Sequence, residues 1–177
     1  MQNSGSIRVR VIRFTALFAI VFTLFSTNAS ASDMFQGKWH LLLNGKAFHI
    51  SKHPTGGAFN ENNWGSGFQY EFDRAAGNDW VSFVNGSIFE DSFHNPSYYY
   101  GGGKGRRYLP GNGWQIDVGV VGFIMARKDY NNYRPFIGAL PFATIGTKNV
   151  GVNITYVPKV NKQLAELVFV QLKIRIQ

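Results

Sequence analysis

The chain has 177 residues, of which 45% are hydrophobic and 16% aromatic, and it carries a formal net charge of +8. It contains no cysteine, which excludes a disulfide-stabilised scaffold and any chemistry that needs a thiol. The basic balance suits anionic lipid headgroups or phosphates. An export signal at the N-terminus argues against nucleic acid as a partner, because it directs the protein out of the cytoplasm.

The N-terminus has the pattern of an export signal. Three arginines precede a short apolar run, 14–25, and Ala29-Ser30-Ala31 then supplies small residues. The run is shorter than the about 20 residues that a helix needs to span a bilayer. We therefore predict a signal peptide over 1–31, removed after export through the Sec pathway. Residues 32–177 are predicted to form one domain.

Eight strand-like segments follow, and each alternates apolar with polar or small residues between turn signals. The connections after the second, fourth and sixth segments are predicted to be short, with Pro110-Gly111-Asn112-Gly113 as the clearest turn. Those after the first, third and fifth are predicted to be longer and polar. The segments are 38–50, 63–73, 79–91, 98–109, 114–126, 134–145, 150–157 and 164–176.

An even number of antiparallel strands, export and alternating loop lengths are typical of outer-membrane barrels. We predict an all-β fold, an eight-stranded antiparallel up-and-down transmembrane β-barrel in the cell outer membrane. We expect it to be a monomer.

The alternation also predicts how the bore is divided. Trp64 and Phe68 fall on the lipid face of their strand, and Glu71 faces inward near the periplasmic end. On 114–126, Asp117 takes the same inward position, and apolar residues follow it on that face. The pattern predicts a polar floor beneath an apolar upper chamber. An eight-stranded barrel holds side chains or one small ligand, and the pattern leaves both fillings open.

Three polar side chains fall at the outer rim of this predicted barrel. His49 ends the first strand, and Asp91 and Ser92 end the third. An imidazole can take a proton from the hydroxyl of Ser92 or of a substrate, and a carboxylate can orient that imidazole. These residues suggest acyl transfer. The alternative is a solvated histidine beside a polar loop, since the spacing matches neither a nucleophile elbow nor a metal site.

At these residues the chain resembles the lipid A palmitoyltransferases, the PagP family. Lys-Ala-Phe-His-Ile at 46–50 is similar to the family's Ala-Trp-His segment, and Phe-Glu-Asp-Ser-Phe at 89–93 to its Phe-Lys-Asp-Ser-Trp. Residues 60–68 are similar to its Asn-Glu-x-x-Trp-Gly-Gly-Gly-Phe. Further motifs follow in the family's order, and the similarity covers most of 38–158. Asn44 and Asn63 stand where the family has prolines.

The resemblance implies an acyltransferase that moves palmitate from a phospholipid donor to a hydroxyl of lipid A in the outer membrane. It implies no cofactor and no metal. It also implies that His49, Asp91 and Ser92 are catalytic, with His49 as general base oriented by Asp91. Gly103 is expected at the floor of the acyl-chain site.

Basic residues of the fifth connection, Arg127, Lys128 and Arg134, are candidates for binding lipid A phosphates. Two other functions stay open. One is a non-enzymatic lipid-binding or structural barrel, and the other is a lipid A deacylase.

Overall fold

The computed structural model describes residues 37–53, 56–73, 77–159 and 165–177. The predicted signal peptide lies outside these residues. No helix in this described part of the chain is both long and apolar enough to cross a membrane.

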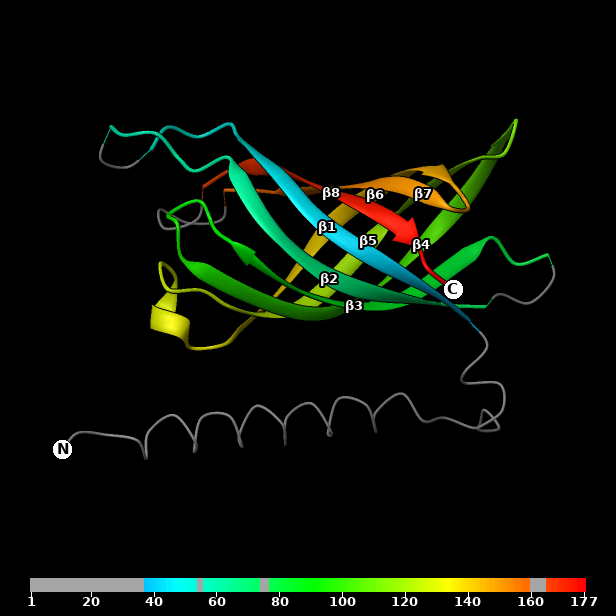
Figure 1. The fold of residues 1–177 in the computed structure, drawn as a ribbon, viewed down its shortest axis with the longest axis horizontal. Coiled ribbons are helices and arrows are strands. Elements are labelled where there is room, and N and C mark those ends of the chain that lie inside the picture. The colour runs from blue at the N-terminus through cyan, green and yellow to red at the C-terminus, as the bar shows by residue number, and fades with distance from the viewer. Residues whose placement is uncertain (1–36, 54–55, 74–76, 160–164) are drawn as a thin grey trace, which may run out of the picture. The chain divides into compact units, whose positions relative to one another are not determined.

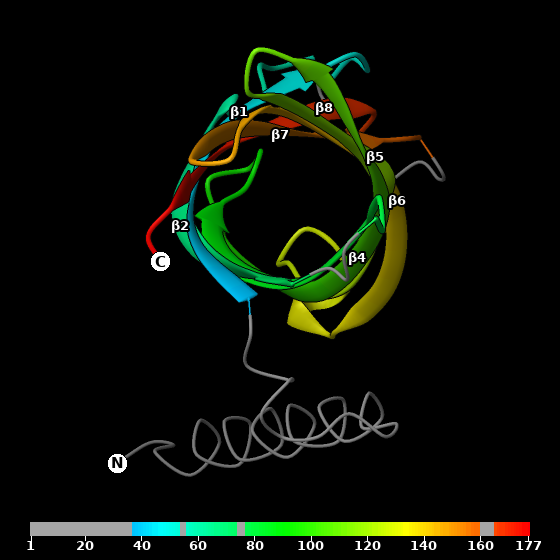
Figure 2. The same cartoon turned by 90° about the vertical axis from the view of Figure 1, so that its right-hand side faces the viewer.

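The described residues form eight antiparallel strands that close into a barrel in chain order, with β8 pairing back onto β1 (Figures 1 and 2). Every predicted segment is a strand, and the predicted ends differ from the observed ones by three residues or fewer. The strands are β1 Gly37–His49, β2 Asn62–Phe72, β3 Trp80–Glu90, β4 Pro96–Gly111, β5 Trp114–Ala126, β6 Phe136–Thr147, β7 Val150–Val157 and β8 Leu167–Arg175.

The predicted alternation of loop lengths fails at β3. The connection after β2 covers residues 73–79, whereas the β3–β4 turn covers only 91–95. This turn is compact because one carboxylate oxygen of Asp91 accepts hydrogen bonds from the backbone N–H groups of Phe93 and Asn95, both at 2.9 Å. An acidic side chain that bonds the backbone two residues on is a common turn device.

Large apolar side chains point outward from the strands, as the alternation predicts for a surface that faces lipid. Trp64 is 69% exposed and Phe68 is 54% exposed, while Gln69 and Glu71 on the same strand are buried. The other strongly exposed strand residues include Trp80, Ile88, Trp114, Val118, Val120 and Ile137.

Four charged side chains are buried in contact with one another at the end of the bore away from His49. Arg107 on β4 binds both carboxylate oxygens of Asp117 on β5, at 2.6 and 2.7 Å. A further guanidinium nitrogen of Arg107 lies 3.0 Å from Glu71, whose other oxygen lies 3.6 Å from Lys173. All four side chains are buried. Two cations balance two anions, and the predicted polar floor is confirmed.

The pairing of neighbouring strands is not the same at the β1–β2 and the β6–β7 boundaries of the barrel wall. The β1–β2 ladder runs from Gly37 to Lys46, with a bulge after Asn44. Asn44 stands where the family has a proline, and its amide donates to the hydroxyl of Ser87 on β3 at 2.7 Å. By contrast, the β6–β7 ladder stops at Phe142. The part of β6 nearer the mouth, 136–141, pairs with β5 but has no ladder partner on β7 among the described residues.

We expect Asp117→Ala to lower the free energy of unfolding by about 3–5 kcal/mol, because its loss leaves two buried cations, Arg107 and Lys173, against the single carboxylate of Glu71. Asp73→Ala is the matched control, since the ion pair of Asp73 with Lys38 is exposed and should contribute about 1 kcal/mol or less. Urea unfolding of the barrel in detergent micelles, followed by tryptophan fluorescence, measures both. Equal losses would contradict a structural role for the buried cluster.

Candidate active site

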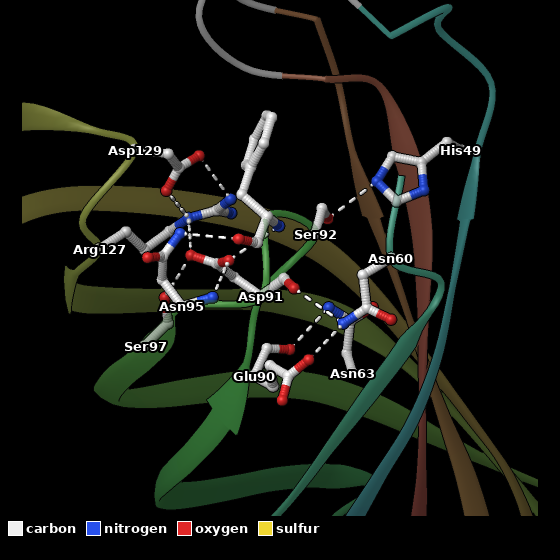
Figure 3. A network of polar contacts seen from close by, with 11 residues as sticks. His49, Asn60, Asn63, Glu90, Asp91, Ser92, Asn95, Ser97, Arg127 and Asp129 are labelled. Atoms are coloured by element: carbon white, nitrogen blue, oxygen red, sulfur yellow. Dashed lines mark hydrogen bonds and ion pairs between the residues drawn. The ribbon is translucent and has the colours of Figure 1, made fainter. Parts of the chain in front are cut away.

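His49 and Ser92 are in hydrogen-bond contact at the mouth of the barrel. Nε2 of His49 lies 2.8 Å from Oγ of Ser92 (Figure 3). His49 is the last residue of β1, and Ser92 is the second residue of the β3–β4 turn. The carbonyl of Ser92 accepts a hydrogen bond from the backbone N–H of Asn60 at 2.9 Å. The loop between β1 and β2 therefore holds the backbone that carries the hydroxyl.

Asp91 lies beside Ser92, but its carboxylate bonds the turn instead of the imidazole. The residue is fully buried. Besides the two backbone bonds of Oδ1, its Oδ2 accepts a hydrogen bond from the hydroxyl of Ser97 at 3.0 Å (Figure 3). In the described part of the chain, the Asp91 carboxylate bonds Phe93, Asn95 and Ser97, and makes no hydrogen bond to His49. The contact observed for Asp91 therefore differs from the orienting contact that we expected.

Arg127 faces the same site from the end of β5. Its guanidinium donates to both carboxylate oxygens of Asp129, at 2.9 and 2.8 Å, and its Nε lies 4.0 Å from Oδ2 of Asp91. The side chain is only 14% exposed, and its guanidinium already binds a carboxylate of the protein. Lys128 and Arg134 are exposed and are the two members of the predicted phosphate-binding set that face solvent.

An aromatic ring holds the imidazole of His49. Phe59 stacks on it with ring centroids 3.9 Å apart and planes inclined by 12°. Phe93 and His53 pack against Phe59 in turn, with centroids 5.7 and 4.7 Å away. Nδ1 of His49 is buried and makes no hydrogen bond of good geometry with any described residue. Ser92 at Nε2 and Phe59 on the ring face both help to position this histidine.

Asn60 anchors Phe59 to the site. Its side-chain amide donates to the carbonyl of Asp91 and to the carboxylate of Glu90, both at 3.0 Å (Figure 3). Sequence reasoning missed both residues as parts of the site. The Asn-Glu-Asn-Asn run before Trp64 was the available signal, because amides that precede a strand often bond nearby backbone.

A cavity in the bore opens beside these residues. Asp91, Ser92 and Arg127 contribute to its wall, and apolar side chains line most of the rest. The wall also contains amides and a phenol, so the predicted apolar upper chamber is only partly correct. The remaining lining residues are Ala47, Asn63, Asn85, Phe89, Tyr99, Val121, Phe123, Met125, Leu140, Thr155, Val157, Leu167, Phe169 and Gln171.

Gly103 is not part of the lining of this cavity. It pairs with Phe83 across the β3–β4 ladder, and a Cβ on Gly103 would lie 2.3 Å from the ring of Phe83. That ring packs with Phe142 and Val121. Val121 also lines the cavity, so the cluster around Phe83 borders the cavity, and the missing side chain of Gly103 leaves room for the Phe83 ring.

A closed antiparallel barrel with large apolar side chains outside and a cavity inside has the features of a membrane-type β-barrel. A family model matches residues 34–173 of this chain, and its description is "Antimicrobial peptide resistance and lipid A acylation protein PagP". The chain belongs to this family.

Two relatives are each named "Lipid A acyltransferase PagP". The protein from Methylobacillus flagellatus is 34% identical over 101 residues, which are 57% of this chain and 54% of the relative. The protein from Serratia proteamaculans is 32% identical over 106 residues, which are 57% of this chain and 51% of the relative. The chain therefore spans about half the length of the curated relatives that it matches.

Among solved structures, the outer-membrane protein Ail of Yersinia pestis in a phospholipid nanodisc is similar with a TM-score of 0.44 and 11% identity. The match covers 80% of this chain and 100% of that one. Family membership, together with the closed barrel, supports a location in the outer membrane.

We expect Phe59→Leu to shift the NMR signals of the His49 ring protons downfield, because a stacked ring shields the protons beneath it. Phe93→Leu is the matched control, since Phe93 packs on Phe59 and His53. Spectra of histidine-labelled barrel in micelles measure both shifts. Unchanged His49 signals in Phe59→Leu would contradict the stack.

Proposed function

We propose that this protein is an outer-membrane acyltransferase that moves a long acyl chain from a phospholipid donor to a hydroxyl of lipid A. The hydrogen bond between His49 and Ser92, at the opening of a largely apolar cavity, carries the proposal. The family description and the names of the two relatives support the same activity.

His49 acts as the general base. For Nε2 to accept a proton, the ring proton sits on Nδ1. The imidazole then removes the proton of the acceptor hydroxyl, whose oxygen attacks the carbonyl carbon of the donor ester. The bond from that carbon to the glycerol oxygen breaks, and the imidazolium returns its proton to the leaving oxygen. Ser92 donates its hydroxyl proton in a hydrogen bond to the carbonyl oxygen as negative charge develops there.

Asp91 supports this chemistry as a positioning residue. Its carboxylate organises the turn that presents Ser92, and its negative charge lies next to Arg127. Lys128 and Arg134 are suited to the phosphates of the acceptor, because both are exposed beside the mouth and carry positive charge.

The part of β6 that has no ladder partner on β7, residues 136–141, suggests how a lipid tail reaches the cavity. Between β6 and β7 the ladder ends at Phe142, next to Pro141, which has no N–H to donate. An acyl chain that enters through this seam keeps its headgroup at the level of His49. The β1–β2 ladder, despite its bulge after Asn44, pairs as far as Lys46 and makes that side a less favourable entrance.

Mass spectrometry of lipid A from cells with and without the protein tests the proposal. We expect a gain of one long acyl chain when the protein is present. Loss of a chain would support a deacylase, and unchanged lipid A would support a passive barrel.

We expect His49→Ala to lower the rate of transfer about 10²–10⁴-fold, the contribution of a positioned acid–base group. His94→Ala, in the neighbouring turn and exposed, should change it little. Ser92→Ala should also reduce transfer strongly. A rate that survives His49→Ala and Ser92→Ala combined would rule out this site.

We expect the cluster around Phe83 to limit the length of the transferred chain. Phe83→Leu enlarges the inner end of the cavity and should lengthen the chain. Gly103→Met should push the Phe83 ring toward the cavity and shorten it, because even a Cβ meets that ring. The acyl length is read by mass spectrometry of the product. Identical lengths in both variants would exclude this floor.

A further inference from the structure

Asn85 is a buried amide at the inner end of the cavity. It is 8% exposed, it lines the cavity, and its Oδ1 is buried without a hydrogen-bond partner among the described residues. It is the next inward-facing residue above Phe83 on β3. A buried amide oxygen without a partner is costly, so a hydrogen-bond donor is expected at this point.

Two of the other polar groups in the cavity wall are satisfied by the protein itself. Gln171 on β8 donates to the amide oxygen of Asn44 and to the hydroxyl of Tyr99, the latter at 3.0 Å. Asn44 in turn donates to Ser87 at 2.7 Å. Tyr99 and Gln171 also line the cavity. They surround the cavity with polar atoms, and Asn85 adds an acceptor that the protein leaves open.

A second buried amide oxygen without a described partner lies at the mouth of the cavity. Oδ1 of Asn63 is also buried without a described partner, but this residue lies beside Glu90, whose carbonyl accepts from its amide at 2.7 Å. There the reacting ester brings polar groups of its own. Asn85 lies six residues before Asp91 on the chain, about 15 Å deeper for a strand that rises about 3.3 Å per residue and is tilted by about 40°. At that depth a bound lipid presents its acyl chain and not its ester or headgroup.

We infer that the cavity binds an acyl chain that carries a hydroxyl group in its distal part, and that Asn85 accepts a hydrogen bond from this hydroxyl. A hydroxyl is the smallest substituent of a hydrocarbon chain that donates a hydrogen bond, and it can accept one as well. An unsubstituted chain leaves the amide unpaired, and sites built around a hydrogen bond discriminate against ligands that lack the matching group. The inference rests on the proposed acyl transfer and names the class of chain transferred.

Competition between donors tests the inference. Vesicles contain equal amounts of two phosphatidylcholines that differ only in the sn-1 chain, which is hexadecanoyl or a hexadecanoyl chain hydroxylated in its distal half. The full barrel transfers from both to lipid A, and mass spectrometry separates the products by one oxygen atom. We expect the hydroxylated chain to be favoured about three- to tenfold, the effect of one well-made buried hydrogen bond. A ratio at or below one would overturn the inference.

Two kinds of control change the place of the hydroxyl on the donor chain and the residue that is proposed to bind it. A donor hydroxylated next to the carbonyl should lose the preference, because its hydroxyl stays at the mouth. Asn85→Leu should abolish the preference, and Asn85→Ala serves if the leucine variant does not fold. Asn153→Leu is the matched control, since Asn153 is a buried amide outside the cavity lining that already accepts a hydrogen bond from Thr144. A preference that survives both Asn85 variants would also refute the inference.

A binding measurement separates this inference from the proposed function. Native mass spectrometry of the detergent-solubilised barrel compares retention of hexadecanoic acid with that of its distally hydroxylated analogue. Stronger retention of the hydroxy acid without any transfer would refute the acyltransferase while supporting the cavity assignment. Transfer to lipid A together with equal retention of both acids would support the acyltransferase and refute the cavity assignment.

Discussion

The ion pair between Arg107 and Asp117 is buried inside the barrel at the end away from His49, and the rest of the interior depends on it. The interior of eight strands is just wide enough for side chains, and four buried charged groups lie in contact with one another there. Glu71 and Lys173 complete their charge balance. Because the buried charges neutralise and bond each other, they need no partner from the cavity, whose wall is mostly apolar.

At the His49 end of the barrel, two different devices hold the reacting groups. A stacked phenyl ring and a serine hydroxyl position the imidazole of His49. The carboxylate of Asp91 shapes the turn from which Ser92 projects. This arrangement differs from a linear acid–base–hydroxyl triad, in which the carboxylate bonds the histidine directly. Orientation here comes from packing and from a compact turn, and both rest on the loop that Asn60 ties to β3.

The cavity between these two ends combines hydrocarbon surface with fixed polar groups. Phe83 and its neighbours border the cavity, while Asn85 and Gln171 place amides within the wall. Apolar walls provide affinity for a chain through its buried area, and a few polar groups decide which chain fits. The incomplete β6–β7 ladder gives this interior a lateral seam that a fully paired barrel lacks.

The sequence by itself determined the number of strands, their faces and the rim at which His49 and Ser92 meet. Alternation with a period of two is local, and the chain order of an up-and-down barrel brings the strand ends together. It also indicated that Glu71 and Asp117 share the polar end. Only the tertiary structure decided which groups touch across the bore, because strand stagger and loop paths follow from closure of the whole barrel and from packing. The ring of Phe59 over His49 depends on a loop path that carries no periodic signal.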